Sequence, residues 1–136
     1  GAAIVTSYGR ADAVPNDHPH FLGHLGRLGS DEAIEAIRRA DVILAAGTRL
    51  SQSTTFYDNR FIPADARIVQ IEVDPKEIGR NYPVEVGIEG DAKAVLEDLI
   101  EKGMLLWMRV LWIRMAMQGL LHFYKILNIQ FLLQEK

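Results

Sequence analysis

The sequence has 136 residues, contains no cysteine and carries a formal net charge of −3. That length suits one ordinary domain with a real core, and the lack of cysteine excludes a disulfide framework and a thiolate metal site. Residues 1–103 hold 11 Lys/Arg and 17 Asp/Glu, whereas residues 104–136 hold 4 and 1. An acidic first part argues against a nucleic-acid-binding surface. The chain opens without the basic and apolar parts of a signal peptide, so we expect a cytoplasmic protein.

The first predicted element is a short buried strand over residues 2–6, Ala-Ala-Ile-Val-Thr. Glycine, proline and asparagine recur from Ser7 to Leu28, which predicts a long loop. Ser30 is a good N-cap, and acidic residues follow it in the first turn, where the helix dipole favours them. Apolar residues at helical spacing then predict an amphipathic helix that ends at about Ala40.

The chain is organised around residues 42–46, Val-Ile-Leu-Ala-Ala, which are closed by Gly47. Five apolar residues in a row predict a strand that is buried on both faces, in the interior of a parallel sheet. Gly47 lets the backbone leave the sheet and places Thr48 and Arg49 at the carboxyl end of the strand. Open α/β sheets bind their ligands at that end.

The next segment, residues 51–66, is polar and predicts a loop or an irregular helix. Two more strands follow at residues 67–73 and 84–88, and Asp91 caps a helix that we expect to end at Gly103. Strands alternate with helices over residues 1–103. This order predicts a three-layer, Rossmann-like α/β domain with a parallel sheet.

Residues 104–136 are different, because they lack Asp, Ser, Thr and Pro but contain both tryptophans. The longest charge-free span, Met115 to Tyr124, is too short to cross a bilayer. We expect a separate, largely helical apolar tail that buries its surface on the domain or on a second copy. Attachment to a membrane surface is the other reading of such a helix.

Several motifs follow one another in one order and spacing. They are Asp17-His18-Pro19, the run Gly23 to Gly29, Ala40-Asp41, Gly47-Thr48-Arg49, the run Ile71 to Gly79, and Gly90-Asp91. Together they resemble the central domain of thiamine-diphosphate-dependent enzymes of the acetolactate synthase type. That group includes sulfoacetaldehyde acetyltransferase and oxalyl-CoA decarboxylase. The resemblance covers roughly Ala2 to Lys102.

The resemblance implies a six-stranded parallel sheet that lies between two thiamine-diphosphate-binding domains. Those two domains hold the catalytic glutamate and the Mg²⁺ motif, neither of which has a counterpart here. The opening strand and helix also have none, so we expect a central domain truncated at its N-terminus. The parent would be a homo-oligomeric transferase or lyase that decarboxylates a 2-oxo acid. This chain would then be a non-catalytic scaffold, with no catalytic residue and no metal ligand of its own. The alternative is a free-standing nucleotide-binding or assembly module.

Several residues at the predicted carboxyl ends of the strands are candidates for binding a nucleotide. Arg49 could grip a pyrophosphate with a bidentate fork, or it could pair with a neighbouring acid. Acetolactate synthases continue after this arginine with Phe-Asp-Asp-Arg, whereas this chain has Leu50 to Ser53. That departure leaves FAD, an adenine nucleotide such as ADP, or an empty structural cleft.

The other candidates each have a plain structural reading. Gly29 and Ser30 open a helix, which offers free N–H groups to an anion or is simply capped. Glu72 and Asp74 could bind ribose hydroxyls or start a turn, and Asp91 is first an N-cap. The candidate cofactor-binding residues are Gly29, Ser30, Gly47, Thr48, Arg49, Glu72, Asp74, Gly90 and Asp91.

A metal site is not expected, although His18, His20 and His24 lie close together in the sequence. No acidic or cysteine ligand stands at helical spacing to complete a zinc site with them. No Ser/His/Asp set has a plausible arrangement either, so nothing supports hydrolysis.

Overall fold

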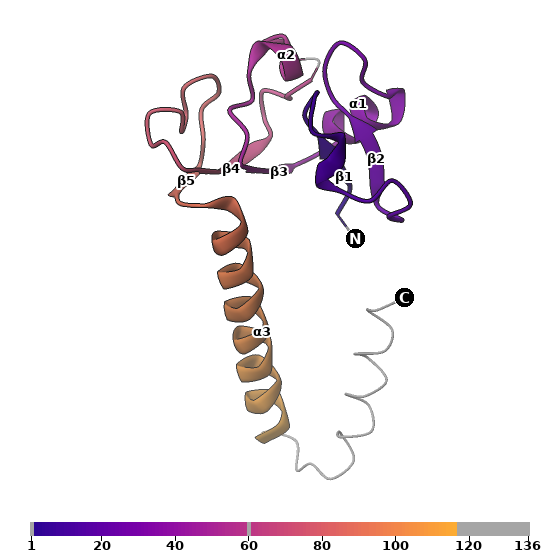
Figure 1. The fold of residues 1–136 in the computed structure, drawn as a ribbon. Helices are drawn as coiled ribbons and strands as arrows, with labels where there is room; N and C mark the ends of the chain where they lie inside the picture. Colours follow the sequence, from indigo (N-terminus) through magenta and orange to yellow (C-terminus); the bar gives the residue numbers. More distant parts are fainter. Residues whose placement is uncertain (1, 60, 117–136) are drawn as a thin grey trace. The chain divides into compact units, whose positions relative to one another are not determined.

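The computed structural model describes residues 2–59 and 61–116 (Figure 1). The chain divides into two compact units, Gly1–Val95 and Leu96–Lys136. The first unit contains every strand that the structure describes, together with the candidate residues of the predicted site.

The strands of the first unit form two parallel sheets. The strands are β1 (Ile4–Thr6), β2 (Phe21–His24), β3 (Val42–Ala46), β4 (Arg67–Glu72) and β5 (Val86–Glu89). β1 pairs with β2 in one sheet, and the other sheet has the order β3-β4-β5. The helical elements are η1 (Ala11–Ala13), α1 (Asp31–Arg38), α2 (Gln52–Thr55) and α3 (Ala92–Ala116). The predicted parallel, Rossmann-like α/β fold is therefore confirmed.

The interior strand of the larger sheet is β4, not β3, so the prediction for residues 42–46 was wrong. Within the described residues β3 pairs with β4 alone. Its side chains alternate, because Val42 and Leu44 are 43% and 51% exposed while Ile43 and Ala45 are buried. An apolar run shows only that both faces are apolar. Whether a second face is covered depends on neighbours that the run does not specify.

The core of the first unit lies between α1 and one face of the strands. Its buried members are Leu25, Ala33, Ile37, Ile43, Ala45, Leu50, Ile62 and Ile68. Ser30 caps α1 as predicted, since its Oγ accepts a hydrogen bond of 3.3 Å from the Ala33 N–H. Burying a large apolar side chain contributes about 1.5–3 kcal/mol, so this cluster holds the helix on the sheet.

Several boundaries within the first unit differ from the prediction. The strands β1, β4 and β5 cover Ile4–Thr6, Arg67–Glu72 and Val86–Glu89, whereas residues 2–6, 67–73 and 84–88 were predicted. The long loop expected from Ser7 to Leu28 contains strand β2, which is short and is interrupted by Gly23 at a φ of +101°. The glycine and proline residues of this segment predicted a loop, although Phe21–His24 form a strand that pairs with β1. Helix α1 ends at Arg38, two residues before the expected end at Ala40.

The second unit begins within α3 and includes its remaining described turns. The expected helix end at Gly103 was wrong, because α3 continues to Ala116. A glycine in a helix interior costs only about 1 kcal/mol relative to alanine, and its neighbours in the sequence are good helix formers. Among the described residues, none of the helices combines the length and the apolar character needed to cross a membrane. The expected tail is described to residue 116, and residues 117–136 lie outside the described part of the chain.

Candidate functional site

The connections that follow the carboxyl ends of the strands pack against one another in the first unit. A Cβ on Gly26, after β2, would collide with the carbonyl oxygen of Ser53, after β3. A Cβ on Gly47 would lie 3.3 Å from the Cβ of Ala92, after β5. Parallel strands present their carboxyl ends at one edge, which is where ligands bind in open α/β sheets. The connections after β2, β3 and β5 therefore approach one another at these two contacts, and a ligand site there stays a prediction.

Arg49 stands on a tightly fixed turn after β3. Gly47 adopts a φ of +61° and its N–H donates to the Ile71 carbonyl at 2.9 Å, so the chain turns directly at the end of the strand. The Thr48 hydroxyl accepts from the Leu50 N–H at 3.3 Å, and the Leu50 side chain is buried in the core. Arg49 itself is exposed. Within the described residues no hydrogen bond or ion pair involves its guanidinium.

The loop between β4 and β5, residues 73–85, holds this turn from the other side. The Asn81 amide donates to the Arg49 carbonyl oxygen at 2.8 Å. Tyr82 packs against the core cluster next to it. Burial raises the pKa of its phenol above the ordinary 10.0, although the Thr55 side chain opposes the shift. Tyr82 is neutral at physiological pH, and its packing against the core holds the loop there.

The side chain of Gln70 connects the two loops, and it is not among the site residues predicted from the sequence. Gln70 lies in β4 and is 2% exposed. Its Nε2 donates to the carbonyl oxygens of Thr48 at 3.1 Å and Glu77 at 3.4 Å, and its Oε1 accepts from the Gly79 N–H at 2.9 Å. A polar residue at a core-facing position of an apolar strand was the available signal, because buried amides are normally hydrogen-bonded.

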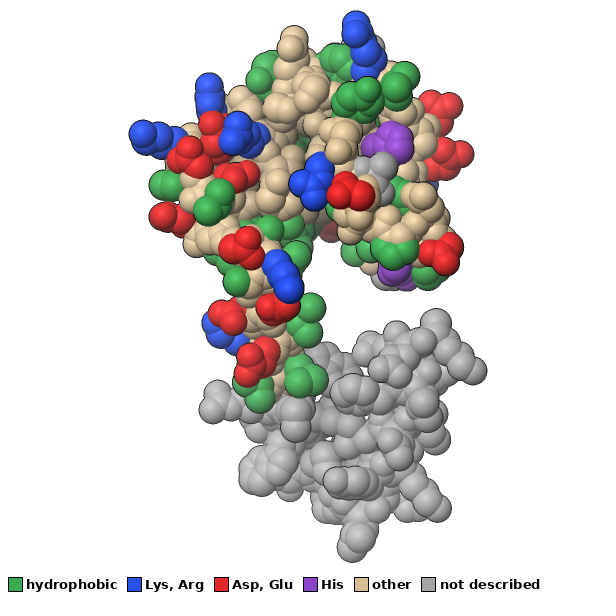
Figure 2. Space-filling model, in the orientation of Figure 1, with side chains coloured by type: hydrophobic (Ala, Val, Ile, Leu, Met, Phe, Trp, Pro, Cys, Tyr) green, Lys and Arg blue, Asp and Glu red, His purple; other side chains and the backbone are tan. Residues whose placement is uncertain are grey.

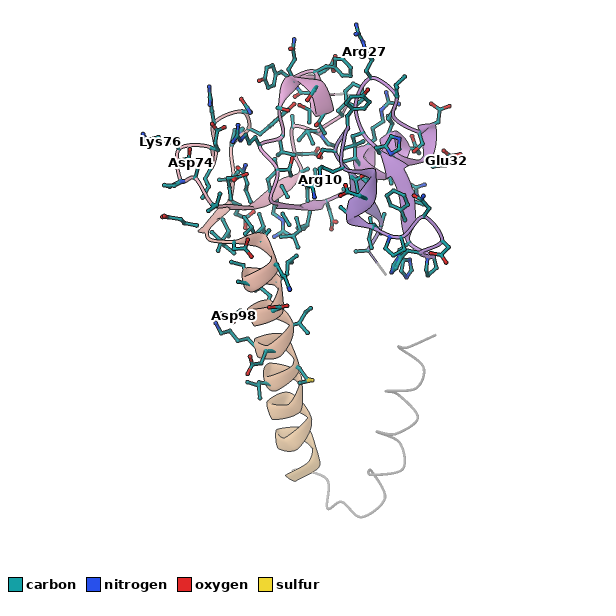
Figure 3. The ribbon with its side chains drawn as sticks, viewed as in Figure 1. Arg10, Arg27, Glu32, Asp74, Lys76 and Asp98 are labelled. Carbon is teal, nitrogen blue, oxygen red and sulfur yellow. The ribbon has the colours of Figure 1, made fainter. Side chains whose placement is uncertain are left out.

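The acidic candidates all form hydrogen bonds with nearby backbone N–H groups. Asp74 accepts from the Lys76 N–H at 3.0 Å within a turn, and both side chains project at the outer end of the loop (Figure 3). Asp91 accepts from the Ala94 N–H at 3.0 Å, so it caps α3. Glu72 is 7% exposed, and its Oε1 accepts from the next N–H in the chain. Binding of a ribose by these carboxylates stays a prediction.

Gly29 and Ser30 likewise form a structural junction. The Ser30 hydroxyl donates to the Leu22 carbonyl at 2.5 Å, and the Ser30 N–H donates to the His24 carbonyl at 3.1 Å. A Cβ on Gly29 would lie 2.8 Å from that same His24 oxygen, so the close approach requires glycine. The β2–α1 connection approaches helix α2 through the Gly26–Ser53 contact. Gly90 lies after β5, and its N–H donates to the Glu72 carbonyl at the end of β4 at 3.1 Å.

Other features of the described surface lie apart from these loops. A shallow, mostly apolar cavity of about 300 Å³ is lined by Ile34, Arg38, Phe56 and Phe61, none of which is a candidate residue. Basic and acidic side chains are intermixed on the face shown in Figure 2. No group of three His, Asp or Glu side chains within the described residues has an arrangement that could hold a metal ion.

These parallel strands, with helices in the connections between them, define a Rossmann-like α/β class of domain. Residues 1–99 match the family described as thiamine pyrophosphate enzyme, central domain. The chain therefore belongs to the central-domain family of thiamine pyrophosphate enzymes.

The chain is also similar to curated proteins that are named as a sulfoacetaldehyde acetyltransferase or as acetolactate synthases. The chain is 44% identical over 103 residues to sulfoacetaldehyde acetyltransferase of Roseovarius nubinhibens, covering 74% of this chain and 17% of the relative. It is 37% identical over 101 residues to acetolactate synthase of Mycobacterium avium, covering 74% and 16%. A probable acetolactate synthase large subunit of Methanocaldococcus jannaschii is 43% identical over 86 residues, covering 63% and 14%. The chain thus spans about a sixth of the length of these relatives.

Proposed function

We propose that this chain acts as the central domain of a larger thiamine-diphosphate-dependent enzyme of the acetolactate synthase type. That enzyme would be cytoplasmic and homo-oligomeric, and would decarboxylate a 2-oxo acid and transfer the two-carbon unit. The family match over residues 1–99 carries the proposal, together with the small share of each relative that the chain covers. The sequence of the coding DNA on both sides is the first check, because it should encode the two cofactor-binding domains.

A chimaeric enzyme tests whether this chain can serve as the central domain of an active enzyme. Residues 1–99 replace the matching segment of the Roseovarius relative, and acetyltransferase activity is assayed with thiamine diphosphate and Mg²⁺ present. Activity well above that of the relative with the segment deleted supports a central-domain role. A soluble chimaera that assembles like the relative but has no activity would contradict it.

Within this enzyme the chain would act as a scaffold. Thiamine diphosphate supplies the carbanion stabilisation in such enzymes, and the protein supplies binding and orientation. The described residues offer no cluster of metal ligands for the Mg²⁺ that accompanies the cofactor. We therefore assign both thiamine diphosphate and Mg²⁺ to the other domains of the parent enzyme.

The exposed Arg49 turn supports a second role, the binding of a nucleotide. Its guanidinium has no partner within the described residues, while its backbone is fixed by hydrogen bonds on both sides. A guanidinium of this kind can contact a diphosphate through two parallel hydrogen bonds. Thr48 would supply its backbone N–H, and Gly47 and Gly90, whose N–H groups donate to the carbonyls of Ile71 and Glu72, would let the chain approach the ligand closely. We propose that ADP, or the ADP half of FAD, binds there.

Calorimetry with ADP and FAD tests the nucleotide site. Arg49→Ala should weaken binding about 10- to 100-fold, because a hydrogen bond to a charged group contributes roughly 1.5–3 kcal/mol. Arg67→Ala is the matched control: Arg67 begins β4 at the opposite edge of the sheet and makes only an exposed 3.9 Å pair with Glu85. Unchanged binding in Arg49→Ala would place the ligand elsewhere, and no binding by the unaltered chain would favour a purely structural cleft.

A further inference from the structure

Gln70 occupies a position that the sheet leaves open for its side chain. In the register of the sheet it lies between Ala45 of β3 and Gly87 of β5, one a small residue and the other without a side chain. A Cβ on Gly87 would lie 2.5 Å from Cγ2 of Ile78, so the β4–β5 loop folds closely onto this part of the sheet. The Gln70 amide therefore lies directly beneath the loops at the carboxyl edge.

The three hydrogen bonds of this amide define the residue type. Two backbone carbonyls, of Thr48 and Glu77, need a donor, and one backbone N–H, of Gly79, needs an acceptor. An amide is the planar group of this size that supplies two donors and an acceptor together. A carboxylate would keep only the bond to Gly79, and an apolar side chain would keep none. Leaving buried backbone groups unpaired is costly, so each lost bond loosens the loop that held it.

The Gln70 amide also acts on Arg49 through the chain. Thr48, whose carbonyl it binds, directly precedes Arg49, and the Arg49 carbonyl is bound by Asn81 of the same loop that holds Glu77 and Gly79. The backbone on each side of Arg49 is thus tied to the β4–β5 loop. The Arg49 guanidinium is unpaired within the described residues. A fixed backbone below an available charged group lowers the ordering cost of binding.

We propose that Gln70 is a positioning residue, which clamps the Arg49 turn to the β4–β5 loop and so sets where Arg49 meets its ligand. The clamp itself does not depend on the identity of that ligand. Its effect on affinity rests on the nucleotide site proposed above. These two parts are tested by different measurements on the same variants.

The test compares Gln70→Met, which keeps the length of the side chain but removes all three hydrogen bonds, with Ile68→Val. Ile68 lies two residues earlier on β4, on the same face, and is 3% exposed. Its truncation removes one carbon atom from the core cluster, which also contains Leu50, but removes no hydrogen bond of either loop. Ile68→Val therefore controls for loss of stability alone, and Gln70→Glu is the variant that keeps the acceptor.

Hydrogen exchange of backbone amides, without nucleotide, tests the clamp. Gln70→Met should speed the exchange of the Gly79 amide at least tenfold relative to β4 amides, and should also speed exchange at Leu50, whose N–H donates to the Thr48 hydroxyl. Gln70→Glu should leave Gly79 more protected than Gln70→Met does, while the Arg49 turn stays loosened. If Gln70→Met changes these amides no more than Ile68→Val does, Gln70 is ordinary core and the proposal is overturned.

Calorimetry with ADP tests the effect on Arg49. At a temperature where every variant is folded by circular dichroism, Gln70→Met should bind about tenfold more weakly, and Ile68→Val should bind like the unaltered chain. Loosened loops with unchanged ADP affinity would overturn the positioning role. If the unaltered chain binds no ADP, the nucleotide site fails, and the position of Arg49 is judged from its amide and side-chain NMR shifts. These must change in Gln70→Met and not in Ile68→Val, or the clamp fails too.

Discussion

Gly26 shows how one residue without a side chain brings two connections together. Its φ is +105°, and a Cβ there would collide with the backbone carbonyl of Ser53. Neither the conformation nor the contact suits any other residue. The sequence pattern around Gly26 predicted a glycine-rich loop, but it could not predict what that loop approaches.

Gly26→Ala should therefore lower the free energy of unfolding by more than the conformational cost alone. Gly9→Ala is the matched control, because Gly9 has a φ of +87° with nothing within 4 Å of its Cβ position. The control should lose about 1–2 kcal/mol from backbone conformation, and Gly26→Ala distinctly more. Urea unfolding followed by circular dichroism measures both. Equal losses would mean that the Ser53 backbone moves away without penalty.

The residues of the candidate site could be predicted only in part. The turn at Gly47, Thr48 and Arg49 was visible because a glycine ends an apolar run. Gln70 was not singled out, since its three partners come from loops 22, 7 and 9 residues away in the sequence. A local pattern shows that a polar residue faces inward, but the partners depend on how the loops fold.

At the scale of elements, the N-caps were predicted well, but burial and the end of α3 were not. Ser30 was recognised as the N-cap of α1, since the signal is local and the hydrogen bond is formed within four residues. Strand β3 was recognised as parallel, but its exposed face was missed. Gly103 was expected to end α3, yet a single glycine is too weak to stop a helix with good formers on both sides.

Ser30→Ala should destabilise the domain by about 0.5–2 kcal/mol, the range for loss of an N-cap. The loss should fall in the upper part of that range, because the hydroxyl also donates to the Leu22 carbonyl. Ser51→Ala is the control, since Ser51 precedes α2 without a side-chain cap hydrogen bond. It should change the free energy of unfolding by less than about 0.5 kcal/mol. A similar loss in both variants would show that the α1 cap contributes little.

At the scale of the whole molecule, the chain by itself should not turn over pyruvate. The described residues hold no cluster that could bind the Mg²⁺ on which a diphosphate cofactor depends. With added thiamine diphosphate and Mg²⁺, assays for acetolactate and acetaldehyde should stay at the level of a blank without protein. Product from the pure chain would show that the assignment of the chemistry to other domains is wrong.

The division between residues 1–103 and 104–136 also remains a prediction, and truncation after Gly103 tests it. The removed segment contains both tryptophans and carries a net charge of +3 from 4 Lys/Arg and 1 Glu. The cut falls inside α3. Because the sequence predicts that the tail buries apolar surface on the domain or on a second copy, its removal should expose that surface, and we expect the truncated chain to lose solubility. Size-exclusion chromatography and thermal unfolding compare it with a control that lacks only Glu135 and Lys136. Identical size, solubility and melting temperature would mean that the segment contributes nothing to the fold.

Strand β3 has one further consequence, for handling the protein in concentrated solution. Within the described residues its outer edge presents unpaired backbone groups, beside the exposed side chains of Val42 and Leu44. Such an edge is a template on which a strand of another molecule can form, and flat apolar edges of this kind seed amyloid-like fibrils. Shelf life should therefore depend on protein concentration. A lysine in place of Leu44 is the substitution that should lengthen the lag before fibrils form, since charges on edge strands oppose such pairing.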